Sequence, residues 1–168
     1  MASPQRAPRL PPFEQVLERY GADVWRFAAA QLGPAHADDV FQDTMLAALA
    51  GYPRVRKPES VKSWLLRIAA RKAIDAIRAR AREPVPVPDV RSAAAAPGPE
   101  PPDEHLWARV RALPPKQRQA VALRTLFDLP YDQIASTMRT SAEAARRNVH
   151  EALKTLREEI SDEDSGAR

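Results

Sequence analysis

The chain has 168 residues, room for one medium domain or two small ones, and a net charge of +4 with a pI near 9.8, so an anionic partner is plausible. Cysteine is absent, which excludes disulfides, thiolate zinc sites and cysteine nucleophiles. The three histidines (His36, His105 and His150) are scattered and lack the spacing of metal ligands. We therefore expect neither a metal nor a cofactor.

The sequence also lacks the patterns of catalytic sites. It contains no Ser/His/Asp set, no paired carboxylates in a predicted cleft and no glycine-rich phosphate loop, so we do not expect an enzyme. The N-terminus lacks the apolar segment of a signal peptide, and nowhere do about eighteen apolar residues run together. We expect a cytoplasmic protein without a membrane span.

Apolar residues at intervals of three and four predict an all-helical first domain over residues 13–82. Its three predicted helices run from residue 13 to the Gly33-Pro34 pair, from about residue 35 to 50, and from near Pro58 to about residue 81. A basic loop that carries Arg54, Arg56 and Lys57 precedes the third helix.

The second predicted helix has two distinct faces. At 100° per residue its buried arc comprises Ala37, Val40, Phe41, Thr44, Met45 and Ala48. The opposite arc carries Asp39, Gln42, Asp43 and, at its centre, the apolar Leu46. By residue type alone this arc is a solvated helix face; the alternative is a docking surface for a basic, partly apolar partner.

The third predicted helix carries arginines along one narrow arc: Arg67, Arg71, Arg78 and Arg82. A helix of roughly 35 Å, at 1.5 Å per residue, matches the reach of several successive phosphates. A solubilising face is the alternative, but the basic loop before the helix favours nucleic acid. Trp64 fits the core of the domain, or it stacks on an unpaired base.

Residues 83–102 are rich in proline and alanine, which predicts an extended or disordered linker. We expect the two domains on either side of it to tumble semi-independently. The second domain, residues 103–160, is again predicted to be helical, and the polar tail from Ser161 is predicted to fray. The chain is therefore predicted to be all-α, with two small helical domains joined by a flexible linker.

The second domain contains the pattern of a helix-turn-helix. A helix starting at Leu113-Pro114-Pro115 precedes a short helix over residues 131–138, a turn over residues 139–141 and a basic last helix. The apolar positions expected in its core are Val121, Leu123, Leu126 and Phe127, with Ala145, Val149, Ala152, Leu153, Leu156 and Ile160 on the last helix. Thr140 or Ser141 is suited to cap that helix. Its outward side carries Arg146, Arg147 and Asn148, residue types that bind guanine and adenine edges bidentately.

Four segments, in order, resemble those of extracytoplasmic-function (ECF) sigma factors, the compact class of the sigma-70 family. HADDVFQDTM at residues 36–45 is similar to the family's acidic DAEDLVQETF helix, and WLLRIA at 64–69, with Asp75 and Arg78 beyond, to its WLxxIAxNxxxDxxR stretch. LPPKQR at 113–118 and LPYDQIA at 129–135 resemble its LPxxxR and LSYEEIA signatures. The resemblance covers nearly everything but the linker and the termini.

The resemblance implies a function and a role for each segment. Asp39, Gln42, Asp43 and Leu46 would dock on the clamp helices of the largest subunit of core RNA polymerase, whose second subunit contributes its flap as a further contact. Promoter recognition and melting at the −10 element would fall to Arg54, Arg56, Lys57, Arg67, Arg71 and Arg78. Binding of the −35 element would fall to Ser141, Arg146, Arg147 and Asn148. The linker would thread through the polymerase, and an anti-sigma factor is a further partner that members of the family often have.

Three positions depart from the family pattern. Arg71 stands in place of the usual Asn, Arg139 in place of the Gly of the turn, and Ala144 in place of a common Thr. Two alternatives remain open. One is a stand-alone helix-turn-helix regulator, which would not explain the acidic and basic helices of the first domain. The other is an RNA-binding helical protein, which would not need the helix-turn-helix.

Overall fold

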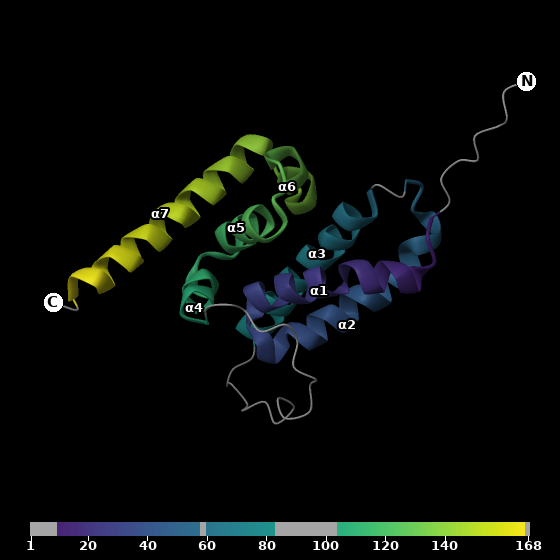
Figure 1. Ribbon diagram of the computed structural model, residues 1–168, viewed down its shortest axis with the longest axis horizontal. Coiled ribbons are helices and arrows are strands. Elements are labelled where there is room, and N and C mark those ends of the chain that lie inside the picture. The colour runs from purple at the N-terminus through teal and green to yellow at the C-terminus, as the bar shows by residue number, and fades with distance from the viewer. Residues whose placement is uncertain (1–9, 58–59, 83–103, 167–168) are drawn as a thin grey trace, which may run out of the picture.

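The computed structural model describes residues 10–57, 60–82 and 104–166, and these residues form helices and no strand (Figure 1). The helices are α1 (Phe13–Leu32), α2 (Pro34–Gly51), the short 3-10 helix η1 (Tyr52–Arg54), α3 (Val61–Ala81), α4 (Glu104–Ala112), α5 (Pro115–Phe127), α6 (Tyr131–Met138) and α7 (Ala142–Gly166). The all-α prediction is confirmed. The predicted linker, residues 83–102, lies outside the described residues.

Helices α1, α2 and α3 pack into the first domain (Figure 1). Gly33 reverses the chain between α1 and α2 with a φ of 90°, a conformation that strongly favours glycine, and its N–H donates to the carbonyl of Ala29. The indole of Trp25 donates to the carboxylate of Asp38 at 2.8 Å and so ties α1 to α2. Helix α3 begins at Val61, three residues later than predicted.

Helices α4 to α7 form the second domain, in which Val110, Leu113, Val121, Ala152 and Leu156 make a small buried cluster separate from a larger one that includes residues of both domains. Two predictions about the end of α7 are wrong. Ile160 was expected in the buried stripe but is 42% exposed, because the last turns of α7 project beyond α5 (Figure 1). The tail from Ser161, expected to fray, continues the helix as far as Gly166. None of the helices within the described ranges is both long enough and apolar enough to span a membrane.

The two domains pack against each other, which differs from the semi-independent arrangement that the linker composition suggested. Helix α1 contacts α4 and α5, and α3 contacts α6. The rings of Phe27 on α1 and Phe127 on α5 lie 6.3 Å apart between centroids. The buried amide of Gln119 on α5 donates to the carbonyl of Ala70 on α3 at 3.0 Å. Linker composition carries no information about such surface complementarity, which is why the expectation failed.

The turn of the helix-turn-helix is built without glycine. Arg139 follows α6 in the left-handed conformation, with φ 54° and ψ 51°, and both its N–H and that of Thr140 donate to the carbonyl of Ala135. The Ser141 hydroxyl then accepts a hydrogen bond from the N–H of Ala144 at 3.1 Å and caps α7. The turn therefore has the tight geometry of a glycine turn, at the cost of placing a side chain in a strained region.

This strain predicts that Arg139→Gly stabilises the protein. Relief of the left-handed arginine should raise the free energy of unfolding by roughly 0.5–1 kcal/mol, since glycine adopts this conformation without a Cβ clash. Urea denaturation followed by circular dichroism measures the change. Glu151→Gly, at an exposed right-handed position inside α7, is the matched control and should instead destabilise by about 1 kcal/mol. Equal losses in both variants would contradict the prediction.

Candidate functional site

Helix α2 presents an exposed acidic face, defined here by Asp39, Gln42, Asp43 and Leu46 and called the α2 face. Leu46 is 67% exposed although it lies in the middle of a well-packed helix. Leu49, one turn further on, is 54% exposed and extends the face. It is not among the predicted residues, although its spacing of three from Leu46 places it on the same side of the helix. Two exposed leucines beside two carboxylates form a surface suited to a basic partner with an apolar contact.

The buried side of α2 determines which residues of the helix face the solvent. Val40, Met45 and Ala48 are buried, and the hydroxyl of buried Thr44 donates to the carbonyl of Val40 at 2.6 Å. Asp38, next to the α2 face in sequence, is not part of it, because it accepts the hydrogen bond from the Trp25 indole. The α2 face is thus the solvent side of a helix whose rotation is set by its core contacts.

The basic loop after α2 is anchored by aromatic side chains. The hydroxyl of Tyr52 donates to the carbonyl of Pro11 at 2.6 Å, and its ring packs edge-on against Phe13, with centroids 5.3 Å apart, and beside Trp64 at 6.2 Å. Burial raises the pKa of the Tyr52 phenol. Gly51 lies close to this aromatic group: a Cβ there would be 3.2 Å from the Trp64 ring, so a larger residue would require the ring to shift slightly. Half-buried Trp64 therefore serves as part of the base of the loop.

The cations predicted to contact nucleic acid in the first domain are exposed: Arg54, Arg56 and Lys57 in the loop, and Arg67, Arg71 and Arg78 on α3. From Arg67 to Arg78 the stripe runs for roughly 16 Å at 1.5 Å per residue. Arg67 differs from the others, because its guanidinium donates to the Ser136 hydroxyl of α6 at 2.8 Å. Close by, the Ser63 hydroxyl donates to the Gln133 side chain at 3.3 Å. The stripe and the helix-turn-helix are therefore in direct contact.

The predicted residues of α7 are placed differently from one another. The Arg146 guanidinium lies over the Tyr131 ring, 5.0 Å from its centroid, and Arg124 lies over the same ring at 5.4 Å. The Asn148 amide donates to the Ala144 carbonyl of its own helix at 2.9 Å. Ser141 is occupied as the cap of α7. Arg147 is exposed on the outer side of α7, which makes it the predicted residue best placed to meet a base edge.

The chain matches the family Sigma-70 region 2 over residues 16–83 and Sigma-70, region 4 over residues 104–156. The ECF RNA polymerase sigma factor SigD of Mycobacterium tuberculosis (strain ATCC 25618 / H37Rv) is 31% identical over 160 residues, which cover 87% of this chain and 76% of that protein. The ECF RNA polymerase sigma factor SigE of Mycolicibacterium smegmatis is 28% identical over 93% of this chain, and the match spans 64% of the length of SigE.

The fold has solved counterparts. The sigma factor RpoE of Bartonella quintana, in complex with the anti-sigma factor NepR, superposes with a TM-score of 0.74 at 22% identity, over 89% of this chain and 96% of RpoE. CnrH, in complex with the cytosolic domain of CnrY, superposes with a TM-score of 0.65 at 19% identity, over 89% and 88% of the two chains. Both sigma-70 regions match in order, and an ECF sigma factor is 31% identical over most of both chains, so the chain belongs to the ECF sigma factors of the sigma-70 family.

Proposed function

We propose that this chain binds core RNA polymerase and directs it to promoters through three separate surfaces. The observation that carries the proposal is the exposed α2 face, with Leu46 at its centre, in the same chain as a helix-turn-helix. A stand-alone regulator needs no such face, whereas a polymerase subunit needs one surface for the enzyme and others for DNA. The protein acts in the cytoplasm by binding and catalyses no reaction.

The α2 face docks on the clamp helices of the largest polymerase subunit in this proposal. Asp39 and Asp43 set the register against basic side chains, while Leu46 and Leu49 supply the apolar contact. The second domain adds a contact with the flap of the second subunit. An anti-sigma factor is a further partner, as NepR is for the Bartonella quintana RpoE, and it would act by covering such surfaces.

The two basic surfaces bind different promoter elements in this proposal. Arg54, Arg56 and Lys57, with Arg67, Arg71 and Arg78, contact the −10 element and the strand displaced there, and the aromatic base under the loop keeps the loop in position. Helix α7 lies in the major groove at the −35 element, with Arg147 at the base edges and the capped N-terminus of the helix near a phosphate.

Binding both promoter elements at once requires the two domains to separate. The elements lie about 25 base pairs apart, roughly 85 Å at 3.4 Å per base pair. In the packed arrangement Arg67 of the −10 surface is hydrogen-bonded to Ser136 on α6, the first helix of the helix-turn-helix. A chain of the length from residue 83 to residue 103 spans at most roughly 70–75 Å. Added to the widths of the two domains, this length is sufficient to place one domain on each promoter element. We therefore propose that the packed arrangement is the state of the free protein and that polymerase binding opens it.

Run-off transcription with core polymerase and a promoter library tests the proposal as a whole. The chain should convert core enzyme into a promoter-dependent enzyme, and one sequence class should be enriched among the transcribed templates. Binding to DNA without co-purification of core polymerase, and without promoter-dependent transcripts, would favour the stand-alone regulator instead.

Charge reversal on the α2 face should abolish polymerase binding. Asp39→Arg combined with Asp43→Arg replaces attraction with repulsion, so affinity for core enzyme should fall by at least about 100-fold. Because both side chains are exposed, helical content and melting temperature should stay nearly unchanged. Fluorescence anisotropy with labelled core enzyme measures the affinity. Glu18→Arg combined with Glu14→Arg, on the exposed side of α1, is the charge-matched control and should bind normally. Equal affinity in both double variants would contradict the docking assignment.

Base preference in the −35 element should depend on Arg147. Arg147→Ala should cost about 1–3 kcal/mol at its cognate base and relax the preference at that position. Arg157→Ala removes the same charge from an exposed site further along α7 and should leave the preference intact. Asn148→Ala should also preserve it, because that amide is bonded within its own helix. A promoter-library selection compares all three with wild type, and an unaltered preference for Arg147→Ala would remove this residue from the recognition surface.

Locking the domains together should block promoter-dependent transcription. The Ser63 and Gln133 side chains meet across the domain contact, and the chain has no cysteine of its own, so Ser63→Cys with Gln133→Cys places a single pair of thiols there, and non-reducing gel electrophoresis verifies that the disulfide has formed. The oxidised protein should lose run-off activity and regain it on reduction, while each single variant should stay active in both states. Full activity of the crosslinked protein would mean that the domains need not separate.

A further inference from the structure

One aromatic ring of the second domain is contacted by two arginines. Tyr131 is the first residue of α6 and is half-buried. The guanidinium of Arg146 on α7 lies 5.0 Å from its ring centroid, and that of Arg124 on α5 lies 5.4 Å from it. Both distances are within the range of about 6 Å over which a cation is attracted by an aromatic face. The ring therefore holds one side chain of the recognition helix from a different helix.

The two arginines differ in their other contacts. A terminal nitrogen of Arg124 donates to the Leu129 carbonyl at 3.0 Å and lies 3.3 Å from the Asp128 carboxylate. Arg146 is exposed and makes no ion pair or hydrogen bond with any residue in the part of the chain that the structure describes. The charge of Arg124 is thus balanced within the domain, whereas the charge and the donors of Arg146 remain available to a ligand.

Stacking on a ring orients a guanidinium without using its donors. The face of the planar group lies against the ring, while its five N–H groups point outward along the edge. Restriction to this orientation lowers the conformational entropy that Arg146 would lose on binding. The stack also directs Arg146 toward α6, whereas Arg147 is exposed on the outer side of α7.

We propose that Tyr131 positions Arg146 to bind a phosphate of the DNA backbone beside the −35 element. The inference rests on the proposed function, in which α7 lies in the major groove. In a helix-turn-helix the helix before the recognition helix crosses the DNA backbone, so an arginine held against α6 lies near phosphates. A guanidinium edge matches the oxygen geometry of a phosphate. Arg146 then supplies affinity that is independent of sequence, and Arg147 supplies base preference.

The salt dependence of promoter binding tests the role of Arg146. Holoenzyme assembled from core polymerase and the full chain is titrated into a labelled promoter duplex from the run-off library, and anisotropy is measured at several salt concentrations. Arg146→Ala should weaken binding to all −35 variants alike and should reduce the slope of log K against log salt by about 0.9. A relaxed preference at one base position with an unchanged slope would show that Arg146 contacts a base, and it would overturn the proposal.

Substitutions of Tyr131 test the positioning role with the same duplex. Tyr131→Leu keeps an apolar side chain but removes the ring, and affinity should fall about two- to fivefold. Tyr131→Phe keeps the ring and should restore binding to the wild-type level. In an Arg146→Ala background Tyr131→Leu should have no further effect, because the side chain that it positions is absent. A general loss of structure would instead weaken binding in both backgrounds, and melting temperatures check that each variant is folded.

The first domain offers a matched control. Tyr20 on α1 is also half-buried, and the Arg19 guanidinium lies 5.4 Å from its ring centroid. Tyr20→Leu therefore removes a similar stack far from the recognition helix and should leave the affinity for −35 variants unchanged. Equal affinity in Tyr131→Leu and Tyr131→Phe, or an equal loss from Tyr131→Leu with and without Arg146, would overturn this inference alone. A wild-type chain that forms no promoter complex with core enzyme would contradict the proposed function as well.

Discussion

The hydrogen bond of the Gln119 amide is buried at the contact between the two domains. Gln119 is 1% exposed, so its polar side chain must find a partner inside the protein, and the carbonyl of Ala70 on the other domain provides it. This hydrogen bond can form only in an arrangement that brings α3 and α5 together, and in that arrangement Phe27 packs against Phe127 and Arg67 reaches Ser136. In an opened protein water satisfies the same amide, so its net contribution is only about 0.5–1.5 kcal/mol. The contact is thus specific and still reversible.

Much of the fold follows from local patterns. The helix boundaries in the first domain come from apolar spacing and from the Gly33-Pro34 stop, and the α2 face follows from the 100° step between residues. The domain contact could not be predicted, because Gln119 and Ala70 are 49 residues apart and glutamine on a helix is usually exposed. The predicted burial of Ile160 was wrong for a related reason. Apolar spacing identifies the side of a helix that faces the core, but the length of the neighbouring helix determines how far along that side the residues are buried.

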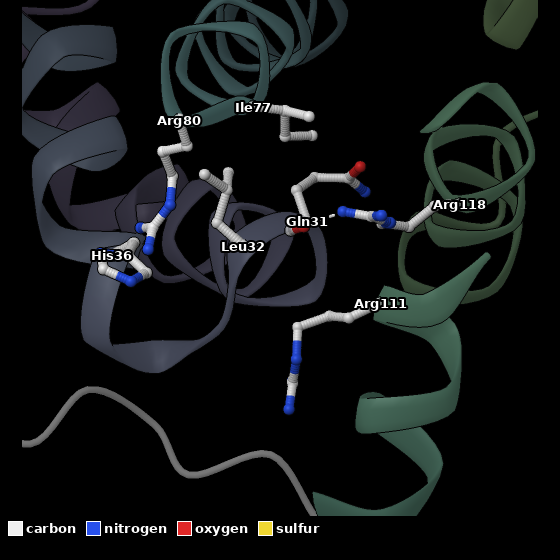
Figure 2. A pocket seen from close by; sticks show the side chains of 7 residues that line it. All are labelled: Gln31, Leu32, His36, Ile77, Arg80, Arg111 and Arg118. Atoms are coloured by element: carbon white, nitrogen blue, oxygen red, sulfur yellow. Dashed lines mark hydrogen bonds between the residues drawn. The ribbon is translucent and has the colours of Figure 1, made fainter. Parts of the chain in front are cut away.

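Within the candidate surfaces, residue type does not distinguish side chains that have different surroundings in the structure. Arg146, Arg147 and Asn148 are equivalent as base-contacting types, yet the structure stacks the first on Tyr131 and bonds the third to its own helix. These distinctions depend on neighbours three or more residues away and on another helix, which no periodicity reveals. The pocket lined by Gln31, Arg80 and Arg118 (Figure 2) could not be predicted for the same reason, since its residues come from helices that become neighbours only after packing.

The stack of Arg124, Tyr131 and Arg146 joins three helices of the second domain through one aromatic ring. Its consequence concerns the engineering of chimaeras. A recognition helix transplanted alone into another scaffold would lose the ring that holds Arg146 at one face of the helix, and that guanidinium would then sample rotamers it does not adopt here. The smallest portable unit is therefore α4 to α7 together, because Val110 and Leu113 complete its core, and an orthogonal promoter reader built from this chain should be cut before α4 rather than at the start of α7.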